Sequence, residues 1–322
     1  MVGLSTPAKD IKRRLNHPGG GQHANLPDLP AAGEFSIAFL PDTQEYSAGY
    51  PDLFRAQTRW IANNQARYNI RAVLHAGDVV DRNEPDQWAN ADSAIRLLDD
   101  TEVPYLLAIG NHDYDSKGDA DRLATSFNAA FPTERYTRHA WWQGGFFEPG
   151  HTENTYCLLP GPGQDYLLLN LEFGPRQAVI DWAHDLLNSH ARHRAILLTH
   201  SYLYIDGTWV SDGHRHNPKL YALGPTANDG ADLWHKLVSR RDNIHLVLCG
   251  HHVGGHLAYR CDRSQAGTAV HQLFANWQQA DNGGNGWMHL LTIAPQAARV
   301  QTFSPTLGQV QADLAGKFVM AL

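Results

Sequence analysis

The sequence predicts an α/β fold: a four-layer α/β/β/α sandwich of two mixed sheets flanked by helices. Two observations lead to this prediction. From residue 34 to residue 252, short apolar runs alternate with segments whose apolar residues recur at helical spacing, and strands that alternate with helices form sheets whose faces the helices cover. Beyond residue 255 the pattern changes to short strands, which we expect to be antiparallel and to complete the second sheet.

The expected elements follow in chain order. Apolar runs predict strands at 35–40, 71–78, 103–111, 166–172, 194–200 and 243–252. Apolar residues at helical spacing predict helices at 53–68, 86–100, 176–190 and 231–241. Four further strand candidates, HLAYR, AVHQLFAN, WMHLLTI and ARVQTFS, come after residue 255. In sheets of this kind the chemistry lies just beyond the carboxyl ends of the strands.

One catalytic domain is expected over residues 33–304. Residues 1–32 are rich in Gly, Pro, Asn and His without an apolar period, which indicates an N-terminal tail or arm. Residues 305–322 are expected to pack at the periphery. The segment 201–229 shows neither a helical nor a strand period, and loops of this length inside a domain usually have a function.

Composition excludes several classes of protein. The 322 residues are 43% hydrophobic, which suits a packed core, and no run approaches the ~20 apolar residues of a membrane-spanning helix. A net charge of −7 without a long basic run argues against a nucleic-acid-coating role. The three cysteines form no CxxC pair, so neither a disulfide framework nor a thiolate zinc knuckle is expected.

The N-terminal sequence bears on localisation. Its basic residues are not followed by the apolar stretch of a secretory signal, so we expect a cytoplasmic protein. A secreted protein whose leader has been removed is the alternative.

Five polar residues directly follow predicted strands. They are Asp42, Asp78, Asn111, His200 and His251. Carboxylate, amide and imidazole ligands suit Mn, Fe, Zn or Mg. A carboxylate can also bridge two ions about 3.5–4 Å apart, an arrangement used for displacement at phosphorus. We therefore expect these side chains to converge on divalent cations at one rim of the sheet.

The motifs around these residues resemble those of the calcineurin-like metallophosphoesterase family. The family pattern is D-x-H, G-D-x-x-D, G-N-H-[DE], an isolated His, and G-H-x-H. The corresponding residues here are Asp42-Thr43-Gln44, Gly77-Asp78-Val79-Val80-Asp81, Gly110-Asn111-His112-Asp113, His200 and Gly250-His251-His252-Val253. The resemblance covers roughly residues 35–303. It implies a metal-dependent phosphatase or phosphodiesterase that hydrolyses a phosphate mono- or diester of a small molecule.

The resemblance also implies a dinuclear metal centre and a mechanism. One ion would be held by Asp78, Asn111, His200 and His251. Asp78 would bridge to a second ion at Asp42, and a metal-activated hydroxide would attack phosphorus. His112 would be the general acid for the leaving oxygen. Asp81 and Asp113 would orient histidines and fix their tautomers.

Two departures from the family pattern affect the second ion. Gln44 occupies the place of a histidine, and Val253 that of the second histidine of G-H-x-H. Gln44 offers a neutral oxygen, while His252 or His256 would substitute after a loop shift; His271 is a further option, with a strand surface as its default place. An amide oxygen holds a borderline metal less well than an imidazole does. We therefore expect this position to be weak, altered or empty.

Aromatic residues provide candidates for a substrate pocket: Tyr202, Tyr204 and His214 in the long segment, and Trp277 farther along. Packing among these aromatics in a surface excursion is the alternative. Two other functions remain open. One is a non-hydrolytic, iron-dependent redox enzyme on the same scaffold. The other is a non-catalytic phospholigand-binding protein, although such a protein has little need for a general acid at His112.

Overall fold

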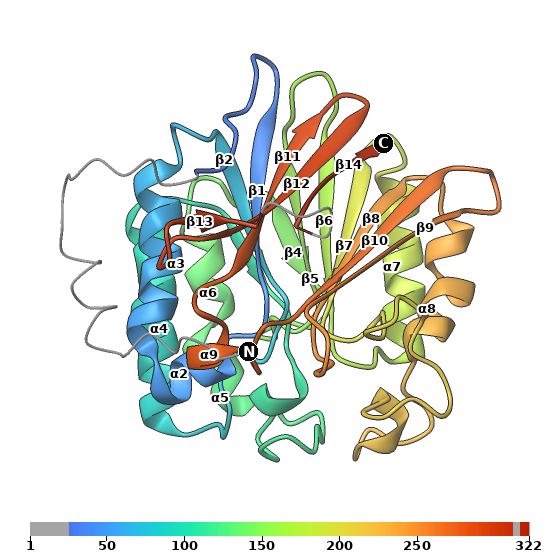
Figure 1. The fold of residues 1–322 in the computed structure, drawn as a ribbon. Helices are drawn as coiled ribbons and strands as arrows, with labels where there is room; N and C mark the ends of the chain where they lie inside the picture. The colour runs from blue at the N-terminus through green and yellow to red at the C-terminus, as the bar shows by residue number, and fades with distance from the viewer. Residues whose placement is uncertain (1–25, 312–315, 322) are drawn as a thin grey trace, which may run out of the picture.

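Two seven-stranded sheets pack against each other in the computed structural model, which describes residues 26–311 and 316–321 (Figure 1). Helices cover the outer side of each sheet. Each sheet contains both parallel and antiparallel pairs. The predicted α/β/β/α fold class is therefore confirmed.

The first sheet has the strand order β13-β12-β11-β1-β2-β3, and β14 also pairs with β12. Its strands are β1 (Phe35–Leu40), β2 (Ile70–His75), β3 (Tyr105–Leu107), β11 (Met288–Ala294), β12 (Ala297–Ser304), β13 (Gln309–Val310) and β14 (Lys317–Ala321). Every residue of β1 is buried, as expected for a strand covered on both faces. Strand β3 is shorter than the predicted 103–111, so residues 108–111 are free to approach the site.

The second sheet has the order β4-β5-β6-β7-β8-β10-β9. Its strands are β4 (Gly144–Phe146), β5 (Thr155–Leu159), β6 (Tyr166–Leu171), β7 (Arg194–Thr199), β8 (Ile244–Cys249), β9 (Leu257–Arg263) and β10 (Ala269–Ala275). The strands β6, β7, β8 and β10 run parallel, so their carboxyl ends meet at one edge.

The four predicted helices are present, and the described part of the chain contains four further, shorter ones that were not predicted. Together the helices are α2 (Gln44–Gly49), α3 (Pro51–Asn64), α4 (Pro85–Asp100), α5 (Thr125–Ala130), α6 (Thr133–Thr137), α7 (Gln177–Ser189), α8 (Gly230–Lys236) and α9 (Asp281–Gly284). Helices α3 and α4 lie outside the first sheet, and α7 and α8 lie outside the second (Figure 1). Short 3₁₀ turns occupy 111–113, 218–220 and 238–240.

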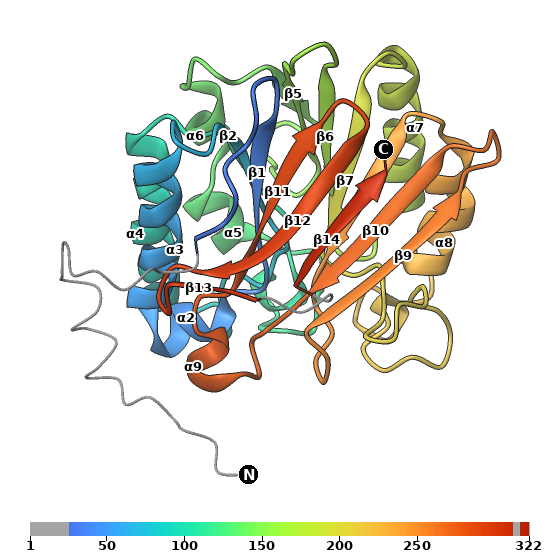
Figure 2. The same ribbon diagram turned by 45° about the horizontal axis from the view of Figure 1, so that its top comes forward.

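The last strands of the chain divide between the two sheets (Figure 2). Strand β10 pairs with β8 and β9 pairs with β10, but β11 pairs antiparallel with β1 and β12 follows it. The prediction that all four complete the second sheet is therefore wrong. A local apolar pattern specifies a strand but not its neighbour, and β1 would otherwise present an unpaired edge.

The two ends of the described chain lie against the first sheet. Residues 26–32 form no helix or strand, and the Asp28 amide donates to Gln301. Most of the predicted tail, residues 1–25, lies outside the described residues. Strand β14 extends the C-terminal segment along β12. In the part of the chain that the structure describes, no helix has the length and apolar content to cross a membrane.

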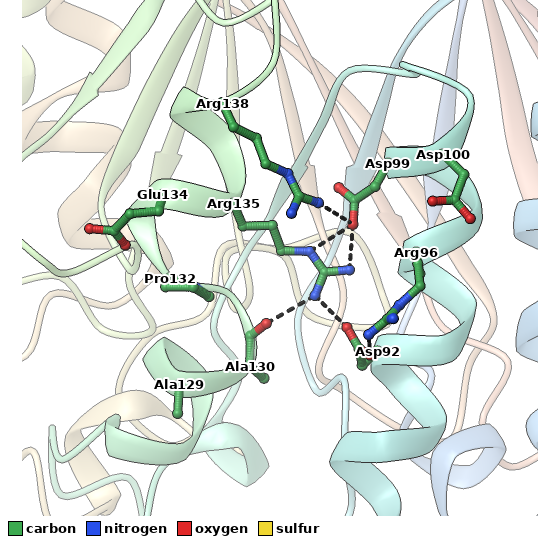
Figure 3. A pocket seen from close by; sticks show the side chains of 10 residues that line it. All are labelled: Asp92, Arg96, Asp99, Asp100, Ala129, Ala130, Pro132, Glu134, Arg135 and Arg138. Carbon is green, nitrogen blue, oxygen red and sulfur yellow. Dashed lines mark hydrogen bonds and ion pairs between the residues drawn. The ribbon is translucent and has the colours of Figure 1, made fainter.

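A charged cavity of about 560 Å³ separates α4 from α5 and α6 (Figure 3). Arg135 is almost fully buried there and forms ion pairs with Asp92 at 2.6 Å and Asp99 at 2.6 Å. Arg138 lies 3.3 Å from the same Asp99 carboxylate. These charges neutralise one another, so they hold the helices together.

Candidate metal centre

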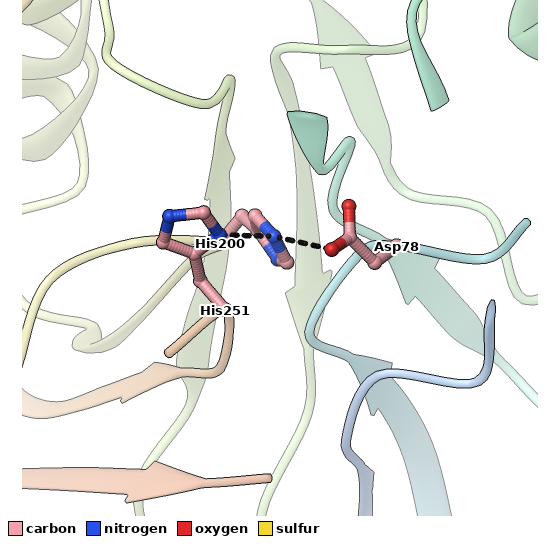
Figure 4. Close-up of side chains that lie close together, drawn as sticks. All are labelled: Asp78, His200 and His251. Carbon is pink, nitrogen blue, oxygen red and sulfur yellow. Dashed lines mark hydrogen bonds and ion pairs between the residues drawn. The ribbon is translucent and has the colours of Figure 1, made fainter. Parts of the chain in front are cut away.

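Three buried side chains converge where β2, β7 and β8 end (Figure 4). Asp78, His200 and His251 each offer one ligand atom, and these atoms lie within 4.8 Å of one another. His200 Nε2 is 3.2 Å from Asp78 Oδ2 and 3.1 Å from His251 Nδ1. The sequence predicted convergence at one rim of the sheet, but β2 belongs to the first sheet and β7 and β8 to the second, so the residues meet where the carboxyl ends of strands from both sheets lie together.

Backbone carbonyls fix the tautomers of the two histidines. His200 Nδ1 donates to the Ala76 carbonyl at 2.8 Å, and His251 Nε2 donates to the His216 carbonyl at 2.8 Å. In the neutral rings, His200 Nε2 and His251 Nδ1 therefore carry no hydrogen. These two lone pairs and the Asp78 carboxylate face one another, an arrangement that a cation would stabilise.

The other two predicted ligands lie beside this triad. Both Asp42 carboxylate oxygens accept from the His251 amide, at 3.0 and 3.2 Å. Asn111 directly follows Gly110, which lies against the Asp78 carboxylate, and its side-chain amide donates to the Gly118 carbonyl at 3.3 Å. Both residues are buried.

Unpartnered polar atoms test whether the residues present suit metal ions. Buried polar atoms normally have a hydrogen-bond partner, because desolvating one without compensation costs about 1–3 kcal/mol. Fourteen buried side-chain atoms of the described residues lack such a partner, and Asn111 Oδ1, Gln44 Oε1 and His252 Nδ1 are three of them. All three belong to side chains that the sequence nominates as ligands. The donor set therefore fits divalent cations.

Backbone strain and close approach also mark this centre. Asp78 has a φ of 49° and His251 a φ of 79°, a left-handed conformation that is costly outside glycine. A Cβ at Gly110 would come within 2.1 Å of Asp78 Oδ1, and a Cβ at Gly250 within 2.1 Å of Asp42 Oδ1. The glycines of the G-N-H and G-H motifs thus let two carboxylates reach the backbone.

Burial and charge perturb the titration of the centre. Desolvation by burial raises the pKa of Asp42 to about 8, and the neighbouring Asp78 carboxylate adds to this. Burial alone would lower the pKa of His200, but Asp78 and Asp42 raise it to about 9. Positive charge at this point therefore offsets the cost of burying two carboxylates.

His112 lies half-buried next to the triad. Its amide donates to Asp78 Oδ1 at 3.0 Å, and its Nδ1 lies 2.6 Å from the Asp81 carbonyl. Burial alone would lower the pKa of His112, but the Asp78 charge and the Asp81 carbonyl raise it above its ordinary value. With Nδ1 bonded to a carbonyl, Nε2 is the nitrogen that remains for a substrate.

The two carboxylates expected to orient histidines act differently. Asp81 orients His112 through its backbone carbonyl, while its carboxylate lies 3.7 Å from His112 Nδ1. The Asp113 carboxylate accepts backbone amides from Val79, Val80 and Gly110. Asp113 therefore ties the G-D and G-N loops together, and the expectation that it orients a histidine is corrected.

The residues considered for the second ion divide into two groups. Gln44 and His252 are buried, and His252 Nε2 lies 3.4 Å from Ser201 Oγ. His256 is exposed, with Nδ1 bonded to the Asn276 carbonyl. His271 bonds through both ring nitrogens, to Tyr259 and to the Ala321 carbonyl. His256 and His271 therefore make structural hydrogen bonds, which corrects the expectation that they replace the missing histidine ligands.

Two of the four predicted substrate contacts are core residues. Tyr202 is fully buried and donates to Gln272, and Trp277 is buried against His289. Both side chains pack inside the protein, so the prediction that they contact the substrate is corrected. Tyr204 and His214 stack at 4.4 Å between ring centroids and are half-buried. Tyr204 also lies edge-on to His252 at 4.9 Å.

Three contacts of the centre were missed in the sequence. Asn276 Nδ2 donates to Asp42 Oδ2, His216 supplies a carbonyl to His251, and the Tyr221 ring lies 6.0 Å from the His251 ring. The His216 carbonyl could not be predicted from the sequence, because every residue type has a backbone carbonyl. Asn276 directly follows a strand, as the predicted ligands do. This position could have indicated that its side chain lies at the centre.

The family is decided by comparison with known proteins. A family model described as calcineurin-like phosphoesterase matches residues 35–255, more than half of the chain. The chain belongs to the calcineurin-like phosphoesterase family. The metal-dependent phosphoesterase scaffold predicted from the motifs is thereby confirmed in general terms.

The chain is also similar to one curated sequence and, in fold, to one solved structure. The protein YvnB of Bacillus subtilis (strain 168), described as uncharacterized, is 30% identical over 286 residues, which are 86% of this chain. The match spans only 20% of YvnB. A purple acid phosphatase, PPD1 from seeds of yellow lupin (Lupinus luteus), has a TM-score of 0.55 and 15% identity; the match covers 92% of this chain and 55% of that one.

Proposed function

We propose that this phosphoesterase hydrolyses a phosphate mono- or diester of a small molecule, using two divalent ions that are held with unequal strength. One observation carries the proposal. Asp78, His200 and His251 each offer one ligand atom, and these atoms lie within 4.8 Å of one another; Asn111 Oδ1 is buried without a partner. Two imidazoles, a carboxylate and an amide oxygen suit Mn, Fe, Zn or Mg.

The proposed ligands divide into a strong and a weak set. Asp78, Asn111, His200 and His251 would hold the strong position. Asp42, Gln44 and His252 would hold the weak position, to which Asp78 would also contribute. Bound there, divalent ions supply activation of the attacking water and neutralise charge on the phosphoryl oxygens. Gln44 and His252 support the weak position because each has a buried polar atom without a partner.

His112 is the proposed general acid. Its Nδ1 is held by the Asp81 carbonyl, which leaves Nε2 to donate a proton or hydrogen bond to the leaving oxygen. The Asp78 charge favours the protonated ring that this role needs. Asp113 acts on the same ring indirectly, because it fixes the loops that carry Asp78 and His112.

The substrate would enter past the long loop. Tyr204 and His214 form a stacked pair beside His252, and both retain exposed surface. Stacked rings of this kind suit the flat or apolar part of an ester. We therefore assign them to the substrate wall.

Metal analysis and a hydrolysis screen on the same preparation test the proposal. The screen uses nitrophenyl mono- and diesters and a panel of phosphometabolites, with D78N and H112Q as variants. We expect turnover that both variants lose and that H235Q retains, since His235 is exposed on α8. Bound iron without turnover would favour the redox alternative, and ligand binding without turnover would favour a binding protein.

A further inference from the structure

The long loop 201–229 reaches the metal centre through its main chain. His251 Nε2 donates to the His216 carbonyl at 2.8 Å, and His251 itself is buried. A carbonyl can only accept, so this contact keeps the hydrogen on Nε2 and directs the bare Nδ1 toward His200. The orientation of one proposed ligand therefore depends on a segment that contributes no ligand of its own.

The side chain of His216 is not what matters in this contact. His216 is exposed and has a φ of 58°, a left-handed conformation that directs the carbonyl inward. Partners of a ligating histidine hold its ring orientation and tautomer, and their loss typically weakens metal affinity about 10- to 100-fold.

An anchor directly after His216 fixes this carbonyl in space. Asn217 is buried, and its Nδ2 donates to Asp229 Oδ2 at 3.0 Å. Lys219 Nζ lies 2.9 Å from the same Asp229 oxygen and 2.7 Å from Asp232 Oδ2. Asp229 caps helix α8, so the loop is tied to the start of a helix that covers the second sheet.

We propose that the His216 main chain, anchored through Asn217 and Lys219 to the start of α8, is a positioning element that sets the metal affinity of the Asp78–His200–His251 centre. The proposal rests on the proposed function, because it requires that the centre binds metal. It gives the long loop a role in metal binding that is separate from the substrate wall formed by Tyr204 and His214.

Co²⁺ binding to the full chain tests the proposal, with the dissociation constant and the visible absorption spectrum as readouts. The H216P variant forces φ to about −65° and moves the carbonyl. We expect it to bind Co²⁺ about 10- to 100-fold more weakly and with an altered spectrum. H216G keeps both the carbonyl and the left-handed backbone, and should lose far less affinity than H216P.

The matched control is G213P, which places a proline in the same loop at a left-handed position with open space around it. It should bind Co²⁺ as the wild type does. N217A loosens the anchor without changing the backbone at His216, so it serves if H216P fails to fold. Its expected effect is the same in direction and smaller.

The outcomes separate this inference from the proposed function. Wild-type Co²⁺ affinity and spectrum in both H216P and N217A would overturn the positioning role while leaving the phosphoesterase proposal intact. Equal losses in G213P and H216P would also overturn it, because the loop would then act through general packing. A wild-type chain that binds no divalent ion would overturn both.

Discussion

Asn276 Nδ2 lies 2.8 Å from Asp42 Oδ2, so a residue that follows β10 holds a carboxylate that follows β1. The same amide donates to Gln278 at 2.9 Å, and Asn276 is buried. Asp42 follows a strand of the first sheet, but it is held by a backbone amide and a side chain that both follow strands of the second sheet. Its orientation decides what the weaker metal position can bind.

Removing the contact between Asn276 and Asp42 should weaken binding of the second ion. In N276A, Asp42 keeps the His251 amide but loses its side-chain donor, which costs about 1–3 kcal/mol for a buried acceptor. We expect fewer ions per chain by elemental analysis and reduced turnover. N64A, which removes a helix-side contact in α3, is the control. Full metal content in N276A would make Asn276 a packing residue only.

Restoring the family's histidine should strengthen the same position. In Q44H an imidazole replaces an amide oxygen whose Oε1 is buried without a partner among the described residues. We expect tighter binding of the second equivalent of Zn²⁺ in a calorimetric titration. Q177H, at the exposed start of α7, should leave the titration unchanged. An unchanged titration in Q44H would show that this side chain does not face the ions.

A methyl group at Gly110 should disrupt the centre. Its Cβ would lie 2.1 Å from Asp78 Oδ1, so either the carboxylate or the G-N loop must move. We expect G110A to lose metal binding and hydrolysis together. G49A is a matched control, because a Cβ at Gly49 meets nothing within 4 Å. Metal affinity in G110A equal to that in G49A would contradict the proposed role of Asp78.

Removing metal should destabilise the protein. Ions that bind only the folded state stabilise it by about 2.7 kcal/mol when their concentration is 100 times the dissociation constant. We expect a chelator to lower Tm in the wild type and to have a smaller effect in D78N. The measurement is thermal unfolding with and without chelator. Equal shifts in the two proteins would show that the stabilising ions bind elsewhere.

Acid should destabilise the fold through His289. Burial lowers the pKa of His289 to about 3, against 6.5 for an unperturbed histidine, so the unfolded chain binds the proton more readily. The free energy of unfolding therefore decreases as the pH falls below 6.5, and the decrease due to His289 is about 2 kcal/mol at pH 5. Urea unfolding of the wild type and H289Q should show this loss shrinking in the variant. Parallel pH profiles would exclude His289 as the source.

Much of the fold was predictable because it is encoded locally. FSIAFL gives a fully buried strand at Phe35–Leu40, and the helical period at 86–100 gives α4 at Pro85–Asp100. The pairing of β11 with β1 was not predictable, because the residues of a strand do not specify which other strand it pairs with. Register and sheet membership depend on packing across the whole chain.

The centre was predictable where its residues are motif side chains. Asp78, His200 and His251 meet because each follows the carboxyl end of a parallel strand within a few residues. The aromatic assignments were less successful: Tyr202 looked like a pocket residue but its hydroxyl is bonded to Gln272 inside the core. Residue type alone cannot distinguish a ring that faces solvent from one that faces the sheet.

The place of β11 has a consequence for biosynthesis. Phe35, among the first residues of the domain, pairs with Ile293 near its end. Chains fold domain by domain as they leave the ribosome, and long-range pairing is slow. Until β11 emerges, one edge of β1 has no strand to pair with. We expect the nascent chain to depend on a chaperone until β11 has been synthesised.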